Sequence, residues 1–170
     1  MTRPGLLEGR AWVFGDHVDT DAIIPVRYCT SIDREELGRY AMSGTHPDFA
    51  SKVVPGDFVV AGCNFGCGSS REVAPLALLG AGVGAVVASS FGRIFYRNAI
   101  NLGLPIFESP EAAASCSPGD LLRAHLEEGV LENVTRRLHF AVAPYPSQVA
   151  EIVAAGGLVE YVRRRLGHGK

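Results

Sequence analysis

The residues best suited to chemistry lie in one glycine-rich stretch, Gly62–Glu72, which reads GCNFGCGSSRE. An apolar run, Phe58–Ala61, precedes it and predicts a buried strand. The apolar positions of residues 74–79 predict a buried helix after it. Ser69 and Ser70 occupy positions typical of a helix N-cap. The sequence therefore predicts a strand, a glycine-rich turn and the start of a helix.

An anion is the ligand that this arrangement favours. The start of a helix presents unpaired N–H groups and a partial positive charge. Arg71 adds a planar guanidinium suited to a carboxylate or phosphate, so we expect a carboxylate site with a hydroxyl nucleophile or base beside it. The spacing matches neither the dinucleotide fingerprint nor the phosphate loop, which needs Gly-Lys before Ser or Thr. A turn without any function is the alternative.

The residues from Asn64 to Glu72 resemble the signature of the small subunits of 3-isopropylmalate dehydratase and homoaconitase, which are stand-alone versions of the swivel domain of aconitase. Two further segments match the same family, GDHVDTDAIIP at 15–25 and SFGRIFYRNAINLGLP at 90–105. The three blocks keep the family's order and spacing. The resemblance implies an α/β fold, the aconitase-like swivel domain (β/β/α), with a mostly parallel central sheet and added antiparallel strands.

The resemblance also implies roles for individual residues. Ser69 would be the catalytic base and would act as an alkoxide, while Arg71 would clamp a substrate carboxylate with help from Ser70. Thr30 lies in the segment that the family uses as a mobile specificity loop, so we expect it to contact the substrate. Three further residues are expected to support the site without touching the substrate: Asp19, Asp21 and Arg93.

The aspartates at 16, 19 and 21 crowd one short polar segment. They can cap turns through their side chains, or they can orient Arg71 and the serine loop, and the residues alone leave both open. We do not expect all three to be catalytic.

Two positions depart from the family pattern. Isopropylmalate enzymes often have Tyr-Leu-Arg-Thr in the specificity loop, whereas this chain has Tyr28-Cys29-Thr30-Ser31 and so lacks the arginine. The family usually continues Arg-Glu with histidine, and this chain has Val73. Both differences favour a paralogue that acts on a substrate other than isopropylmalate.

The function predicted first is that of the small subunit of a heteromeric hydro-lyase, 3-isopropylmalate dehydratase, in leucine biosynthesis. The alternatives are the small subunit of homoaconitase or of a related hydroxy-diacid dehydratase, and a non-catalytic anion-binding or regulatory module. A stand-alone hydrolase using Ser69 is disfavoured, because His17 is the only histidine near a motif and no G-x-S-x-G occurs.

The cofactor is expected outside this chain. Cys63 and Cys67 form an isolated C-x3-C pair, whereas an iron–sulfur cluster normally needs three or four thiolates. No metal ligand is therefore predicted here, and the resemblance implies a [4Fe–4S] cluster in a large partner subunit. This chain would then hold half of a site for a small hydroxy di- or tricarboxylic acid, and it would be inactive alone.

Composition narrows the class of protein. The formal net charge of −2 predicts no nucleic-acid partner. No apolar run reaches the length of a membrane span and no charged-then-apolar leader opens the chain, so we expect no membrane association. The four cysteines lack a secreted-type framework, which favours free thiols and a cytoplasmic location. We expect one swivel domain over residues 1–170.

The remaining pattern predicts the elements that position the site. Continuous apolar runs predict strands at 10–14 and 83–88 beside the one at 58–61. Helices are expected at 33–42, 91–102, 147–155 and 158–166, and antiparallel strands at 121–126, 130–134 and 138–143. Residues 43–56 are expected to form a polar connection with His46 facing solvent.

Overall fold

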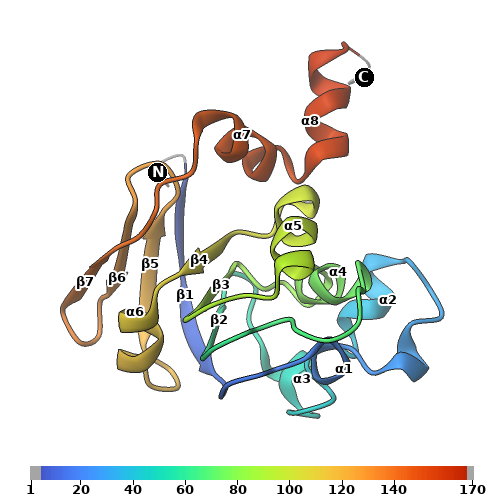
Figure 1. Cartoon of the computed structure of the whole chain (residues 1–170), viewed down its shortest axis with the longest axis horizontal. Coiled ribbons are helices and arrows are strands. Elements are labelled where there is room, and N and C mark those ends of the chain that lie inside the picture. Colours follow the sequence, from blue (N-terminus) through green and yellow to red (C-terminus); the bar gives the residue numbers. More distant parts are fainter. Residues whose placement is uncertain (1–4, 168–170) are drawn as a thin grey trace.

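The computed structural model describes residues 5–167, and Figure 1 shows how their helices surround a central sheet. The sheet has seven strands in the order β4-β3-β2-β1-β5-β6-β7. The strands are β1 (Leu6–Val13), β2 (Phe58–Ala61), β3 (Ala85–Ala88), β4 (Ile106–Glu108), β5 (Leu121–His125), β6 (Val130–Asn133) and β7 (Leu138–Ala141).

The helices are short and mostly lie between the strands. They are α1 (Thr20–Ile23), α2 (Arg34–Gly38), α3 (Phe49–Lys52), α4 (Val73–Gly80), α5 (Arg93–Leu102), α6 (Pro110–Ser115), α7 (Ser147–Ala155) and α8 (Leu158–Arg165), with one 3-10 turn, η1 (Val26–Tyr28). Among residues 5–167, no helix has the length and hydropathy that crossing a membrane requires.

Strand β1 joins two halves of different design. On one side it runs parallel to β2, with Ala11 opposite Phe58, and β3 and β4 continue the parallel half. On the other side it runs antiparallel to β5, with Leu6 opposite His125, and β6 and β7 complete an antiparallel half. Helices α4 and α5 connect the parallel strands, as crossovers in such sheets require. The predicted mixture of parallel and antiparallel strands is confirmed.

The central strands are buried because both faces of the sheet are covered. In β2, Val59 and Ala61 enter one apolar cluster while Phe58 and Val60 enter the other, as the two-residue period of a strand dictates. The first cluster is completed by side chains of α1 to α5, and the second by side chains of β5, β6, α6 and α7. Continuous apolar sequence therefore marks a strand that is enclosed on both sides.

Several predicted elements have the expected ends. Asp33 caps α2 by accepting a hydrogen bond from the N–H of Glu36, at 2.8 Å. Gly103 closes α5 in the left-handed region, at φ 83°. Helix α2 is shorter than predicted and ends at Gly38, and Met42, at the predicted end, has a left-handed backbone at φ 58°, which a helix cannot contain.

The sequence prediction missed other features. Strand β1 begins at Leu6 rather than at residue 10, because its first half pairs with the distant β5. Helix α3 interrupts the expected polar connection, since Phe49 inserts into the core. Helix α6 was also missed, although Ser109 caps it and Pro110 occupies its first turn.

His46 does not face solvent as predicted. The residue is partly buried, and its ring packs edge-on against Trp12 at 5.5 Å and Phe14 at 6.4 Å between centroids. The buried α3 segment that follows draws this histidine against β1, which a polar-looking sequence does not reveal.

Candidate functional site

The glycine-rich loop leaves β2 at its carboxyl end and reaches α4 by a tight path. Gly66 and Gly68 have φ of 77° and 92°, in the left-handed region that favours glycine. A Cβ on Gly66 would also collide with the ring of Phe95 in α5. The loop therefore depends on glycine at this position both for its backbone and for its packing.

A second segment, residues 16–20, holds the loop along its length. Asp16 accepts a hydrogen bond from the N–H of Cys63 at 2.7 Å, and the carbonyl of Val18 accepts one from Gly66 at 2.8 Å. Thr20 makes two contacts, donating its N–H to the carbonyl of Cys67 at 2.9 Å and its hydroxyl to the carbonyl of Ser69 at 3.1 Å. The two sequence blocks thus form one structural unit.

The predicted helix cap at Ser69 and Ser70 is wrong. Helix α4 begins at Val73, with Glu72 as its N-cap and no side-chain capping bond. Pro75 explains the difference, because it has no N–H to donate and therefore belongs in the first turn of a helix. Ser69 lies four positions before that start, and the field of a helix dipole fades within a turn. Stabilisation of an ionised Ser69 must then come mainly from other groups.

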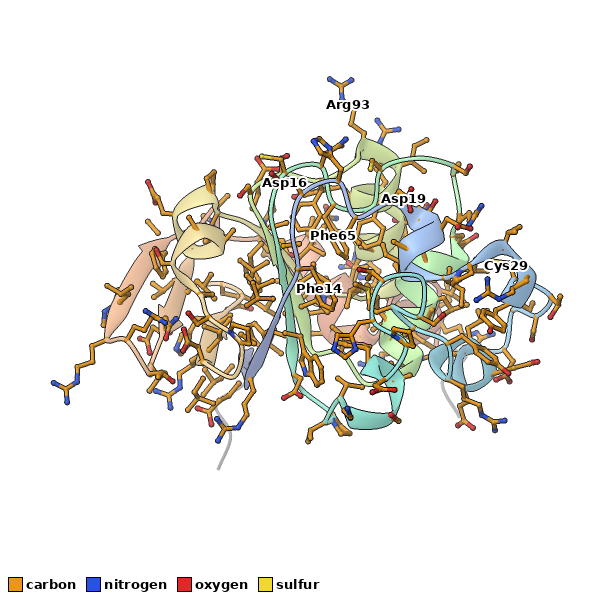
Figure 2. All side chains as sticks on the ribbon, turned by 90° about the horizontal axis from the view of Figure 1, so that it is seen from below. Phe14, Asp16, Asp19, Cys29, Phe65 and Arg93 are labelled. Carbon is orange, nitrogen blue, oxygen red and sulfur yellow. The ribbon has the colours of Figure 1, made fainter. Side chains whose placement is uncertain are left out.

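Ser69 and Arg71 line one open pocket with a volume of about 370 Å³. Ser69 is exposed, so its hydroxyl is accessible rather than sealed inside. Arg93 lines the same pocket at the start of α5, and Figure 2 shows it pointing away from the body of the protein, at the edge that also carries Asp16 and Asp19. Three predicted site residues are therefore brought together.

Arg71 is held in place from α1. Its Nη1 donates to Asp21 and to the carbonyl of Ile24, both at 3.2 Å, and its side chain is only 20% exposed. The pKa of Asp21 lies below its ordinary value, first because the N–H of Val26 binds the carboxylate and then because Arg71 does. Asp21 thus stays ionised and orients Arg71, one of the two roles left open by the sequence.

The other predicted residues lie outside the pocket lining. Asp19 caps α1 by accepting a hydrogen bond from Ala22 at 2.7 Å, which is the turn-capping alternative. Ser70 is exposed on the loop, and Thr30 is exposed after η1. His17 is exposed too, and neither it nor any other histidine of residues 5–167 lines the pocket of Ser69 as a hydrolase would need.

The family resemblance places Asp19-Thr20-Asp21 beside the active site, but sequence reasoning missed the role of the Thr20 hydroxyl. Thr20 is 3% exposed, and its hydroxyl fixes the backbone of Ser69. A threonine between two aspartates gave no signal of its own, because the contact joins positions far apart in the chain.

No group of three metal-ligating side chains occurs in the part of the chain that the structure describes. Cys63 is exposed and Cys67 is partly buried, and both are free thiols. Within residues 5–167, the side chains therefore do not offer the three or four grouped thiolates that an iron–sulfur cluster normally needs.

Comparisons with known proteins identify the family of this chain. Residues 45–111 match the model of the aconitase C-terminal domain. The chain is 53% identical to the 3-isopropylmalate dehydratase small subunit of Moorella thermoacetica, over 95% of this chain and 97% of that protein. This chain belongs to the family of 3-isopropylmalate dehydratase small subunits. The resemblance of its three sequence blocks is thereby confirmed.

Other members of the family are equally close in length. The isopropylmalate/citramalate isomerase small subunit of Methanocaldococcus jannaschii is 47% identical, over 97% of this chain and 98% of that protein. A crystal structure of 3-isopropylmalate dehydratase from the same organism superposes with a TM-score of 0.88 at 42% identity, covering 96% of both chains. The swivel-domain fold predicted from the sequence is therefore confirmed.

Proposed function

We propose that this chain is the small subunit of a heteromeric 3-isopropylmalate dehydratase, which interconverts 2- and 3-isopropylmalate by removing and re-adding water in leucine biosynthesis. The observation that carries the proposal is the near-full-length relationship to dehydratase small subunits at about half identity. The accessible Ser69 beside a fixed Arg71 supports it. The continuous sheet supports treating residues 1–170 as a single swivel domain.

The hard step in such a dehydration is removal of a proton from a carbon beside a carboxylate. In our proposal Ser69, ionised to its alkoxide, takes this proton and becomes a neutral hydroxyl, and Arg71 binds the carboxylate with a planar pair of N–H donors. Ser70 lies between these two residues in the sequence, and Arg93 lines their pocket. We assign Ser70 and Thr30 to contacts with the substrate, and Arg93 to the positive charge around it. Asp19 and Asp21 hold the supporting geometry.

The proposal requires a partner. Departure of hydroxide calls for a Lewis acid, and this chain has no residues arranged to hold one within the described range. We propose that a large subunit supplies it from a [4Fe–4S] cluster, and that the open pocket of Ser69 faces that subunit. The complex would act on a small hydroxy acid in the cytoplasm and involve neither nucleic acid nor membrane.

A broader substrate range is the second candidate. The relative from Methanocaldococcus jannaschii is named for both isopropylmalate and citramalate. Thr30 replaces the arginine expected in the specificity loop, and Val73 packs against the first apolar cluster where a histidine is usual. The alternative functions are therefore the small subunit of a related hydroxy-diacid dehydratase, the small subunit of a homoaconitase, and a regulatory module without chemistry.

Reconstitution tests these candidates. The chain is purified anaerobically with a large subunit, and the pair is assayed with isopropylmalate, citramalate, homocitrate and citrate. We expect turnover of isopropylmalate to be the fastest. The Ser69→Ala variant should lose at least a hundredfold in kcat while still binding substrate, because only the proton transfer is removed. Hydration of none of these acids would overturn the enzyme proposal, and full activity of Ser69→Ala would overturn the role of Ser69.

A further inference from the structure

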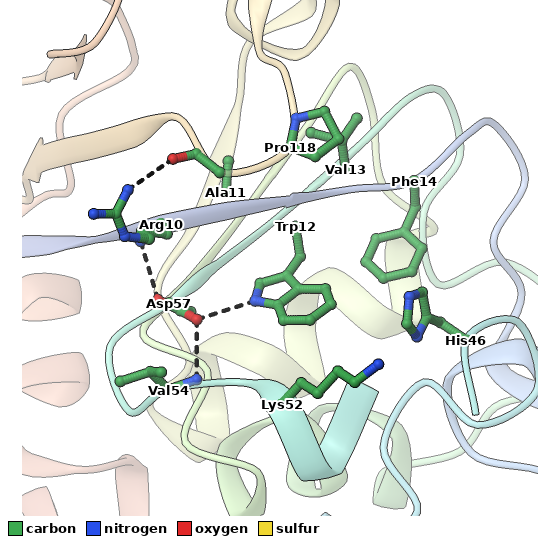
Figure 3. Close-up of a pocket in the computed structure, with 11 residues that line it drawn as sticks. Arg10, Ala11, Trp12, Val13, Phe14, His46, Lys52, Val54, Asp57 and Pro118 are labelled. Carbon is green, nitrogen blue, oxygen red and sulfur yellow. Dashed lines mark hydrogen bonds between the residues drawn. The ribbon is translucent and has the colours of Figure 1, made fainter. Parts of the chain in front are cut away.

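A second cavity lies away from the serine loop and shares no lining residue with it. Its volume is about 390 Å³, within the range of small-molecule sites. Figure 3 shows it between the end of β1, the segment that carries α3, and the turn at residues 118–119. The proposed dehydratase chemistry gives this cavity no role.

Aromatic rings form one wall of the cavity. Trp12 in β1 and Phe14 just after its end project to the same side, and His46 packs edge-on against both. Within residues 5–167 the buried Nδ1 of His46 has no hydrogen-bond partner. Val54, which is 61% exposed, adds an apolar side chain at the rim. Such a surface gains free energy by covering an apolar group.

The acidic residue in the lining is already committed to the protein. Asp57 accepts hydrogen bonds from the backbone N–H of Arg10, the indole N–H of Trp12 and the N–H of Val54, all at 3.0 Å. These contacts, drawn in Figure 3, leave the carboxylate little capacity for a ligand cation. A positively charged ligand is therefore disfavoured.

The cations of the lining are more available. Figure 3 shows the side chain of Lys52 running beside the Trp12 indole, with its ammonium toward His46. Lys52 pairs with Asp48 at 3.0 Å, but both side chains are more than half exposed, at 59% and 65%. Exposed ion pairs contribute little free energy, so the ammonium can turn to another anion. Arg10 adds a second cation, with its Nη1 donating to the carbonyl of Gly119 at 3.1 Å.

We propose that this cavity binds a small amphipathic carboxylate. The apolar body of the ligand lies against Trp12 and Phe14, and its carboxylate pairs with Lys52. The proposal does not depend on the dehydratase activity, because none of these residues lines the pocket of Ser69.

The test uses a reporter that the chain already contains. Trp12 is the only tryptophan, so emission excited at its absorption edge reports this cavity alone. The isolated chain is titrated with 4-cyclohexylbutyrate, its uncharged amide and 4-cyclohexylbutylamine, which are similar in size and do not absorb there. We expect a saturable emission change with the carboxylate, binding about fivefold weaker for the amide and weaker still for the amine.

Two variants test whether Lys52 supplies the positive charge that binds the carboxylate. Lys52→Gln should weaken binding of the carboxylate about fivefold and leave the amide unchanged. Arg163→Gln, an exposed cation on α8 outside the cavity lining, should change neither. Thermal melting checks that both variants fold, and Lys52 is exposed enough to be replaced safely. Equal affinity for all three probes, no saturable change, or an unaltered Lys52→Gln titration would each overturn the proposal.

Discussion

Arg71 offers most of its hydrogen-bonding capacity to the pocket. Of the five N–H donors of a guanidinium, the two contacts recorded within residues 5–167 both use Nη1. Asp21 and the carbonyl of Ile24 thus fix the direction of the side chain while leaving the other donors available to a carboxylate. The pKa of the same aspartate lies below its ordinary value, so its carboxylate is negatively charged at neutral pH.

Replacing Asp21 by asparagine tests this orientation. In an active reconstituted pair, Asp21→Asn should raise KM about three- to tenfold and change kcat less, since the charge that aligns Arg71 is lost while Ser69 stays in place. Steady-state kinetics at neutral pH measure the effect. Asp48→Asn, which breaks an exposed pair on α3, is the matched control and should leave both constants unchanged. An unaltered KM in Asp21→Asn would contradict the orienting role.

Helix α1 acts as the clamp of the serine loop although it has only four residues. Its first residue, Thr20, binds the loop backbone on either side of Gly68, at Cys67 and at Ser69. Gly68 is close to α1, because a Cβ added to this glycine would lie at ordinary contact distances from Asp19 and Thr20. The backbone of Ser69 is therefore set by a buried hydroxyl rather than by the start of α4.

Thr20→Val removes this hydroxyl at nearly constant volume. We expect kcat of the reconstituted pair to fall about tenfold with a small change in KM, because Ser69 loses its alignment while Arg71 keeps its own. Thr20→Ser keeps the hydroxyl and should restore most of the rate. Hydrogen exchange of the amides of residues 68–71 in the isolated chain should quicken in Thr20→Val alone. Equal rates and exchange in the three proteins would show that the hydroxyl does not position Ser69.

Local sequence signals predicted the elements that depend on local chemistry. The cap at Asp33, the glycine end of α5 and the enclosed strand β2 all follow from side chains within a few residues. The serine cap failed because Pro75 shifts the start of α4, and the sequence does contain that proline. Thr20 and His46 could not be placed, because their roles depend on segments that meet only in the folded chain.

At the scale of the whole molecule, a buried carboxylate supports the junction between the two halves of the sheet. Asp120, just before β5, is 6% exposed and accepts hydrogen bonds from Ser117, Asn133 and Arg136. Its own carbonyl accepts a hydrogen bond from Ala11 of β1 at 2.8 Å. Burial raises the pKa of this carboxyl, but the three donors outweigh that effect and hold the pKa below its ordinary value.

Because the pKa of Asp120 is lower in the folded protein than in the unfolded chain, the free energy of unfolding depends on pH. The contribution of Asp120 is fully present above the unfolded pKa of about 3.9 and is lost as the pH falls through the lower native value. Asp120→Asn should therefore reduce the free energy of unfolding at pH 7 by about 2 kcal/mol, and the difference should shrink toward pH 2. Urea denaturation at several pH values measures it. A difference that stays constant across this range would contradict the ionised role of Asp120.

The mixed sheet was predicted because its parallel and antiparallel halves have different patterns of apolar residues in the sequence. Apolar runs separated by helices mark β2 to β4, while short alternating runs such as Leu121–His125 mark the antiparallel half. The order of the strands could not be derived in the same way. It depends on β1 pairing with β2 and β5, which are remote from it in the chain.

The central place of β1 has a consequence for synthesis on the ribosome. Strand β1 emerges before the other described strands, yet one of its partners, β5, is made only after two thirds of the described chain has appeared. Its edge must wait unpaired during that time, and unpaired edges are where nascent chains associate with one another. Slowed elongation or a missing chaperone should therefore lower the yield of folded protein before it affects chains that have already folded.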